Sequence, residues 1–239
     1  MWQPPYHDDR LVTINFYPHA MSCSIIERAW TVAPFIVQAY QRFAFKNLEL
    51  ENLMVFNPTA VGRLVHTFLK KHRAQDAFVA CSLRGPQLFE RYVTVNSQTP
   101  QASDFVLPEL KTLVWDYRYA YPIDHGKSVC YVAGLPHAVI TQYQLFAIQT
   151  QLHMTILMPE QMALLQVYRY QRGLTFRRTQ LAVDMLQHHN MVDYLCNTDT
   201  LGRILHVPNH LVLDRAHEVG PLLAACGLFI SEGVDDEKY

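Results

Sequence analysis

The sequence predicts a mixed α/β fold, and three features of the chain support this prediction. Residues 11–45 are dominated by Val, Ile, Thr, Phe and Tyr and are interrupted by prolines, which is typical of three consecutive antiparallel strands. In the third of these strands, alternation with a period of two places Phe35, Val37 and Ala39 on one face. Further along, apolar residues recur at helical spacing in some segments and at strand spacing in others.

The composition limits the classes of function. The 239 residues suffice for one or two domains with a large core. The formal net charge of −1 gives no general attraction for nucleic acid or for an acidic membrane. Charged residues make up only 17% of the chain, against roughly 25% in an average soluble domain. A weakly charged, aromatic-rich surface would suit a subunit that binds partners, and an ordinary large core explains the composition equally well.

Targeting signals and cysteines favour a cytoplasmic protein. The first ten residues lack the basic and apolar segments of a signal peptide, and no apolar run approaches the roughly 18 residues that cross a bilayer. The cysteines are odd in number, widely scattered and surrounded by apolar residues, so we expect them to be reduced core residues. They are Cys23, Cys81, Cys130, Cys196 and Cys226.

A helix is predicted from Pro58, because Asn57 is a suitable N-cap and proline is favoured at the first helical position. It ends in the basic run Lys70, Lys71, His72 and Arg73. Such a run can bind nucleic acid, but cations are also favoured by the backbone dipole at the end of any helix, and we prefer that explanation.

Strands are then predicted at residues 77–83 and 88–95, a loop at 97–104 and another strand at 113–121. In this last strand, four aromatic residues fall on one side. Such a row either forms an exposed platform for a peptide or packs as a sheet face under other elements. The four residues are Trp115, Tyr117, Tyr119 and Tyr121.

The remainder of the chain predicts a hairpin and alternating helices and strands. A turn at 124–126 leads into a strand at 128–133, followed by a helix at 136–153, a strand at 154–157 and a helix from 159. Beyond Gly173 the pattern weakens. We expect a helix at 181–188, a strand at 203–207 and a closing helix of small residues at 219–230.

No local motif indicates catalysis, a metal or a cofactor. The twelve histidines provide no ligand spacing, since His188 and His189 diverge on a helix and Pro208 separates His206 from His210. There is no Cys-x-x-Cys pair, no nucleophile elbow and no glycine-rich phosphate loop. The sequence therefore predicts no catalytic residue, no metal site and no bound cofactor.

Taken in order, these segments resemble PilM, the actin-like cytoplasmic protein of type IV pilus assembly, and its shorter relatives in DNA-uptake pilus systems. The strand and helix order matches, and three short segments carry the likeness. Residues 90–95 resemble the family's Arg-x-hydrophobic-x-hydrophobic stretch, residues 114–117 its hydrophobic-x-Asp-Tyr stretch, and residues 224–228 its closing Ala-x-Gly-Leu helix.

The resemblance implies an actin-like (ribonuclease H-like) fold in three parts. A first lobe with the antiparallel three-stranded meander is expected at residues 1–85. An inserted small α/β subdomain is expected at 86–158, and a return helix with a reduced second lobe at 159–239.

The departures from the family concern the turn that binds phosphate. The family's first turn is similar to Gly-Ile-Asp-Ile-Gly-Ser, in which the Asp reaches the magnesium shell and the Gly allows close backbone approach. Here Asn15 replaces the Asp, and Tyr17, Pro18 and His19 replace the rest. Asn15 has no charge for a metal, Tyr17 adds a bulky side chain, and Pro18 removes an amide donor. We therefore expect a degenerate turn without ATPase activity or a nucleotide cofactor.

The family's role implies the partner and the location. We expect a non-catalytic scaffold that is peripheral to the inner membrane on the cytoplasmic side and binds the N-terminal peptide of a PilN-like membrane protein. The row from Trp115 to Tyr121 is the candidate wall of the peptide groove. Membrane contact is expected only through that partner, and no nucleic acid is expected. Two alternatives stay open: a divergent ATP-binding pocket, and an unrelated α/β enzyme whose site forms only in three dimensions.

Overall fold

The computed structural model describes residues 10–29, 34–45, 50–51, 53–123, 126–175, 200–209, 211 and 215–233. The strands are β1 (Arg10–Tyr17), β2 (Ala20–Arg28), β3 (Phe35–Ala44), β4 (Leu50–Glu51), β5 (Met54–Val55), β6 (Phe78–Leu83), β7 (Phe89–Val95), β8 (Leu113–Ile123), β9 (Lys127–Pro136), β10 (His153–Pro159) and β11 (Leu205–His206). The helices are α1 (Pro58–Lys71), α2 (His137–Gln149), α3 (Glu160–Thr175), α6 (Thr200–Ile204) and α7 (Arg215–Gly233), with short 3₁₀ turns at Ala102–Asp104 and Pro108–Thr112.

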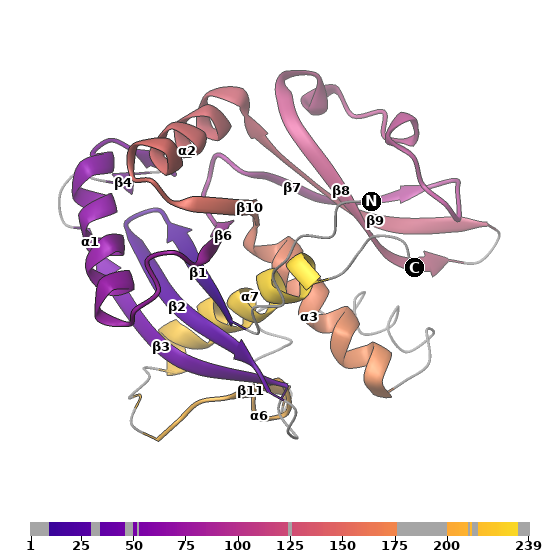
Figure 1. The fold of residues 1–239 in the computed structure, drawn as a ribbon. Coiled ribbons are helices and arrows are strands. Elements are labelled where there is room, and N and C mark those ends of the chain that lie inside the picture. Colours follow the sequence, from indigo (N-terminus) through magenta and orange to yellow (C-terminus); the bar gives the residue numbers. More distant parts are fainter. Residues whose placement is uncertain are drawn as a thin grey trace, which may run out of the picture.

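A six-stranded sheet forms the centre of the molecule, in the order β10-β6-β1-β2-β3-β11 (Figure 1). Strands β1, β2 and β3 are antiparallel neighbours, so the predicted meander is confirmed. Strands β6 and β10 run parallel to β1, and β11 runs parallel to β3. The carboxyl ends of β1, β6 and β10 therefore meet at one edge of the sheet.

Helices cover both faces of this sheet. On one face, Val12, Ile14 and Phe16 pack with the apolar sides of α1 and α2. On the other face, Leu11 belongs to the core formed with α3 and α7. The alternation of side chains along β1 thus assigns Thr13, Asn15 and Tyr17 to the α3–α7 side.

The start of α1 follows the predicted capping. The backbone N–H of Ala60 donates to Asn57 Oδ1 at 3.0 Å, and Pro58 opens the helix. This bond satisfies one of the amides that the first turn leaves without a helical partner. The prediction of a helix starting at Pro58 is confirmed.

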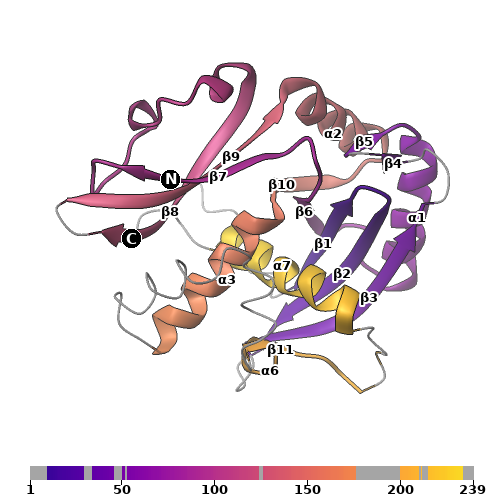
Figure 2. The same cartoon turned by 180° about the vertical axis from the view of Figure 1, so that it is seen from behind.

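A second sheet, in the order β7-β9-β8, lies beside the first (Figure 2). Its own small core contains Val95, Phe105, Leu110, Cys130 and Val132. Strand β10, which falls within the expected insertion at 86–158, pairs instead with β6 in the large sheet. The three-part division of the chain stays a prediction; of the strands in the expected insertion, β7, β8 and β9 form a sheet of their own.

One sequence prediction about β3 is wrong. Phe35 and Val37 belong to the core on the α3–α7 side, whereas Ala39 belongs to the core on the α1–α2 side. The pairing with β2 shifts between Ile25 and Ile26, which leaves one extra residue in β3. Such a bulge sends the following side chains to the opposite face.

Helices α3 and α7 cross in close contact. A Cβ atom on Gly227 would lie 1.9 Å from the carbonyl oxygen of Ala163 and 2.4 Å from its carbonyl carbon. Both helices contribute fully buried side chains near the crossing, including Leu164 and Leu228. The predicted closing helix is confirmed, and its glycine allows the backbones to approach.

Several other predictions concern the remaining segments. The strand expected at 203–207 is shorter, because α6 extends to Ile204 and β11 covers two residues. The helix expected at 181–188 and Cys196 lie outside the described residues.

The other four cysteines are buried free thiols, as predicted. Within the described ranges, no helix is long and apolar enough to cross a membrane.

Candidate functional site

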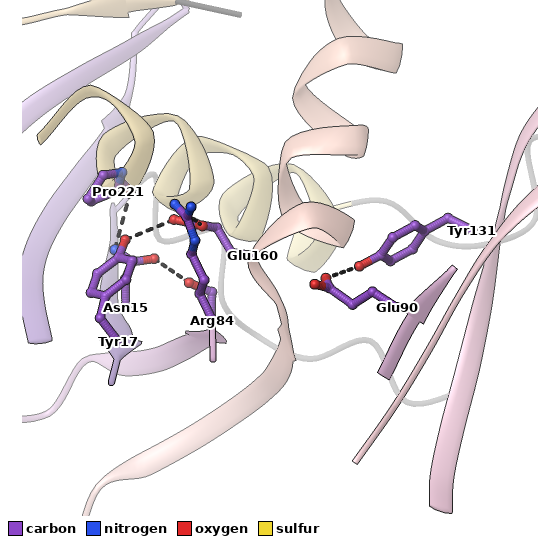
Figure 3. Close-up of polar contacts among 8 residues, drawn as sticks. Asn15, Tyr17, Arg84, Glu90, Tyr131, Glu160 and Pro221 are labelled. Carbon is purple, nitrogen blue, oxygen red and sulfur yellow. Dashed lines mark hydrogen bonds and ion pairs between the residues drawn. The ribbon is translucent and has the colours of Figure 1, made fainter. Parts of the chain in front are cut away.

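The carboxyl ends of β1, β6 and β10 form the candidate site, because ligands of open α/β sheets bind beyond the carboxyl ends of the strands. Three side chains from these ends come together (Figure 3). Tyr17 ends β1, Arg84 follows β6, and Glu160 is the first residue of α3 after β10. A backbone hydrogen bond from Arg84 N–H to the carbonyl of Phe16 (3.0 Å) holds the end of β6 against β1.

These three side chains interact directly. The hydroxyl of Tyr17 donates to Glu160 Oε1 at 2.9 Å, and Arg84 forms an ion pair with Glu160 Oε2 at 3.4 Å. The Glu160 side chain is 1% exposed, whereas that of Arg84 is 56% exposed. Glu160 also lies in the first turn of α3, where the helix dipole favours a negative charge. The Tyr17 side chain is therefore held against the first turn of α3.

Asn15 forms a second buried network on the same face of β1. Its Nδ2 donates to Ser22 Oγ and to the carbonyl of Pro221, both at 3.2 Å, while Ser82 Oγ donates to its Oδ1 at 2.5 Å. A carbonyl oxygen only accepts hydrogen bonds, so the amide nitrogen must face Pro221. Both amide hydrogens are used, and the side chain is fully buried.

The turn that the family resemblance assigns to phosphate binding connects two neighbouring strands of the large sheet. Pro18 and His19 form the tight connection between β1 and β2, and the carbonyl of His19 accepts a hydrogen bond from Phe45 N–H at 2.9 Å. His19 is exposed and Pro18 is half-buried. The hairpin is thus bound to the end of the meander, with Tyr17 directed towards α3.

Burial controls the electrostatics of the site. Desolvation raises the pKa of Glu160, while Arg84 and the Tyr17 hydroxyl act in the opposite direction. Desolvation, followed by the charge of Glu160, raises the pKa of Tyr17 well above its usual range, so Tyr17 stays a neutral donor. A second carboxyl group, Glu90, accepts a hydrogen bond from the Tyr131 hydroxyl, and burial raises its pKa as well.

The raised pKa of Glu160 predicts that the effect of Glu160→Gln on thermal stability depends on pH. A carboxyl group whose folded pKa is raised stabilises the fold below its unfolded pKa, and this contribution is lost as pH rises through the folded pKa. We therefore expect the melting temperature of the wild type, relative to Glu160→Gln, to fall as pH rises above about 4.5. Thermal melts of both proteins at closely spaced pH values would measure this. A constant difference across pH 4–8 would contradict the assignment.

The four aromatic residues predicted on β8 do not share one face. Trp115 and Tyr117 pack on Phe105, with ring centroids 5.8 and 4.5 Å apart, and the Tyr117 hydroxyl donates to the carbonyl of Pro100 at 2.8 Å. The pairing with β9 shifts between Tyr119 and Tyr121. Tyr121 consequently lies in the core shared with α3 and α7, and the prediction of a common face is wrong for this residue.

The enzyme alternative has little support among the described thiols. Cys81 and Cys130 are buried, and desolvation raises their pKa values to about 12 and about 11. A thiol in this state is a poor nucleophile at neutral pH. In the part of the chain that the structure describes, no three His, Cys, Asp or Glu residues group as metal ligands.

Sequence reasoning did not identify Glu160, Arg84 or Glu90. The pair Pro159-Glu160 after the apolar strand could have indicated this site, because an acidic residue in the first turn of a helix is electrostatically favoured. Its contact with Tyr17 spans 143 positions and depends on the order of the strands in the sheet.

The sheet order and the helices on both faces of the large sheet define a mixed α/β protein. Neither a protein-family model nor a curated protein sequence matches the chain. Among solved structures, it is similar to a chain of a PilM–PilN type IV pilus biogenesis complex, with a TM-score of 0.56 and 12% identity over 94% of this chain and 98% of that chain. The predicted likeness to PilM is therefore confirmed at the level of the fold.

Two other solved structures give lower scores. The cytoplasmic domain of EpsL, an inner membrane component of the type II secretion system of Vibrio cholerae, has a TM-score of 0.40 and 10% identity over 64% of this chain and 57% of that chain. A protein with an actin-like ATPase fold from Bacteroides thetaiotaomicron VPI-5482 has a TM-score of 0.33 and 7% identity over 70% of this chain and 57% of that chain.

Proposed function

We propose that this chain is a non-catalytic scaffold in the assembly of a type IV pilus or a related DNA-uptake pilus. Its partner in this proposal is the cytoplasmic N-terminal peptide of a PilN-like inner-membrane protein. The observation that carries the proposal is the fold shared with PilM over 94% of the chain. The proposal places the protein in the cytoplasm, peripheral to the inner membrane.

The site at the strand ends supports a role without ATP hydrolysis. Tyr17 and Arg84 engage Glu160, and Asn15 uses both amide hydrogens within the protein. No charged carboxylate stands at position 15 to reach a magnesium shell. In addition, only residues 176–214 separate α3 from α7, fewer than the roughly 50 residues of the smallest usual domain. A second lobe that encloses a nucleotide does not fit into this length.

The small sheet offers a surface for an extended peptide. Strand β8 pairs with β9 on one side, and no strand within the described ranges pairs with its other edge. An extended peptide can add to such an edge through backbone hydrogen bonds, and neighbouring side chains then give specificity. Trp115, Tyr117 and Tyr119 are half-buried on this strand and are our candidates for that contact.

A binding experiment with two substitutions tests the proposed partner. The probe is a labelled peptide with the cytoplasmic N-terminal sequence of a PilN-like membrane protein. We expect the double variant Trp115→Ala/Tyr119→Ala to weaken binding by about 30-fold, as loss of a central aromatic contact does. Fluorescence anisotropy would measure the affinity, and circular dichroism would verify the fold.

Val106→Ala is the matched control, because this exposed apolar residue lies in the segment before β8. It should leave the affinity unchanged. Equal affinity of the folded double variant and the wild type would show that the aromatic side chains of β8 do not hold the peptide.

Residual ATP binding is the second candidate function, and the actin-like fold favours it. Calorimetry with ATP and magnesium distinguishes residual ATP binding from the scaffold proposal. The scaffold proposal expects no saturable heat at micromolar concentrations. Saturable binding that is lost on disrupting the strand-end site would establish the divergent pocket instead.

A further inference from the structure

The outer layer formed by α1 and α2 has an unusual charge distribution. Neither helix contains an aspartate or a glutamate. The exposed side of α1 carries Arg63, Lys70 and Lys71, and Arg73 follows the helix. No ion pair joins these four side chains to any residue that the structure describes. A surface helix normally mixes both signs of charge, so the cations of α1 call for an explanation, although the exposed Asp76 follows Arg73 three positions later.

Residues outside α1 add to this positive field. Arg10, from the start of β1, donates from its NH2 group to the carbonyl of His72 at 3.0 Å and so lies at the end of the helix. Desolvation lowers the pKa of His72, and the charges of Lys71 and Arg10 lower it further. The helix dipole accounts for Lys70 and Lys71 at a C-terminus, but not for Arg63 in the middle of α1 or for Arg10.

Helix α2 adds exposed apolar side chains to the same layer. It contains no charged residue, and Leu145 and Ile148 on its outer side are 50% and 72% exposed. Phe56, which is 58% exposed, lies next to α2, because Gln142 exchanges two hydrogen bonds of 3.0 Å with the backbone of Val55.

The two helices form one continuous surface. The His66 ring of α1 bonds to the carbonyl of Thr150, just after α2, at 2.6 Å. Both helices lie on the face of the large sheet opposite α3 and α7, as Figures 1 and 2 show. The exposed cations of α1 and the exposed aliphatic side chains of α2 are thus carried by two helices in contact on the same face of the sheet.

We propose that this surface, defined by Arg10, Arg63, Lys70, Lys71 and Arg73 with Phe56, Leu145 and Ile148, docks on an anionic lipid membrane. Basic side chains attract acidic headgroups, and exposed apolar side chains enter the boundary between headgroups and acyl chains. A nucleic acid duplex would use the basic side chains through phosphate contacts, but it would leave the exposed apolar side chains of Phe56, Leu145 and Ile148 without a role. This inference goes beyond the proposed function, in which only the partner contacts the membrane.

Vesicle binding of the full chain tests the inference without any partner protein. We expect flotation with vesicles of phosphatidylglycerol and phosphatidylcholine, but not with vesicles of phosphatidylcholine alone. Because exposed charges are screened, binding should decrease as salt is raised from 50 to 500 mM. Lys70→Gln/Lys71→Gln should lower the partition coefficient on the order of 20-fold. Ile148→Ser should lower it by about fivefold.

Lys111→Gln/Lys127→Gln is the matched control, since both lysines are exposed on the small sheet side and the charge change is the same. It should bind vesicles as the wild type does. The inference is overturned if the wild type ignores anionic vesicles, or if the control loses as much binding as Lys70→Gln/Lys71→Gln. Tighter binding to a short DNA duplex, lost in the same Lys70/Lys71 variant, would reassign the surface to nucleic acid and also overturn it.

Discussion

Gly227→Ala is expected to prevent stable packing of α7 on α3. The added Cβ would lie 1.9 Å from the carbonyl oxygen of Ala163, and backbone atoms cannot move aside as a flexible side chain can. The helices would have to separate, which opens a core in which Leu164 and Leu228 are fully buried. We expect the free energy of unfolding to fall by at least about 3 kcal/mol, measured by urea denaturation.

Gly202→Ala is the matched control for this substitution. Gly202 lies in α6, and a Cβ there would meet nothing within 4 Å. Alanine favours the helix over glycine by up to about 1 kcal/mol, so this variant should be as stable as the wild type or slightly more stable. If Gly227→Ala unfolds at the same urea concentration as the control, the two helices are not held at the close distance described.

Asn15→Asp is expected to destabilise the protein although it restores the family residue. The amide of Asn15 donates to the carbonyl of Pro221 and to Ser22, and an ionised carboxylate cannot donate. The substitution would bury a negative charge against a carbonyl oxygen. We expect a loss of about 3 kcal/mol at neutral pH, measured by chemical denaturation. Burial should raise the pKa of the new carboxyl group, so the loss should shrink towards pH 4.

Asn96→Asp provides the control, because Asn96 is exposed and the chemical change is identical. It should alter stability by less than about 0.5 kcal/mol. A stable Asn15→Asp variant that binds ATP with magnesium would contradict the network described here. That result would mean that the negative charge introduced by Asn15→Asp is sufficient for this protein to bind a nucleotide.

Local patterns predicted the strands and helices well, because each depends on neighbouring residues. Asn57 and Pro58 give the start of α1, and the alternation along residues 11–45 gives the meander. The bulges in β3 and in β8 could not be seen in the sequence. A bulge depends on how a strand pairs with its neighbour, so its position is decided by the tertiary structure. The bulge in β3 places Ala39 on the face opposite to the predicted one, and the bulge in β8 does the same for Tyr121.

The candidate site was predicted only in part, for a similar reason. The turn from Asn15 to His19 could be recognised by its departures from a family pattern. Its contacts with Glu160 and Pro221 join residues separated by 143 and 206 positions. The order of the parallel strands brings Glu160 to the turn, and the packing of α7 on the sheet brings Pro221 there. No spacing rule in the sequence relates such distant residues.

The packing of α7 on β1, β2 and β6 has a consequence for biosynthesis. The helix begins at Arg215, whereas β1 begins at Arg10 and β6 at Phe78, so the strands that it covers are translated long before it. Until α7 has left the exit tunnel, the part of this sheet face that the helix covers in the folded protein stays exposed, and chaperones that bind apolar strands can bind there.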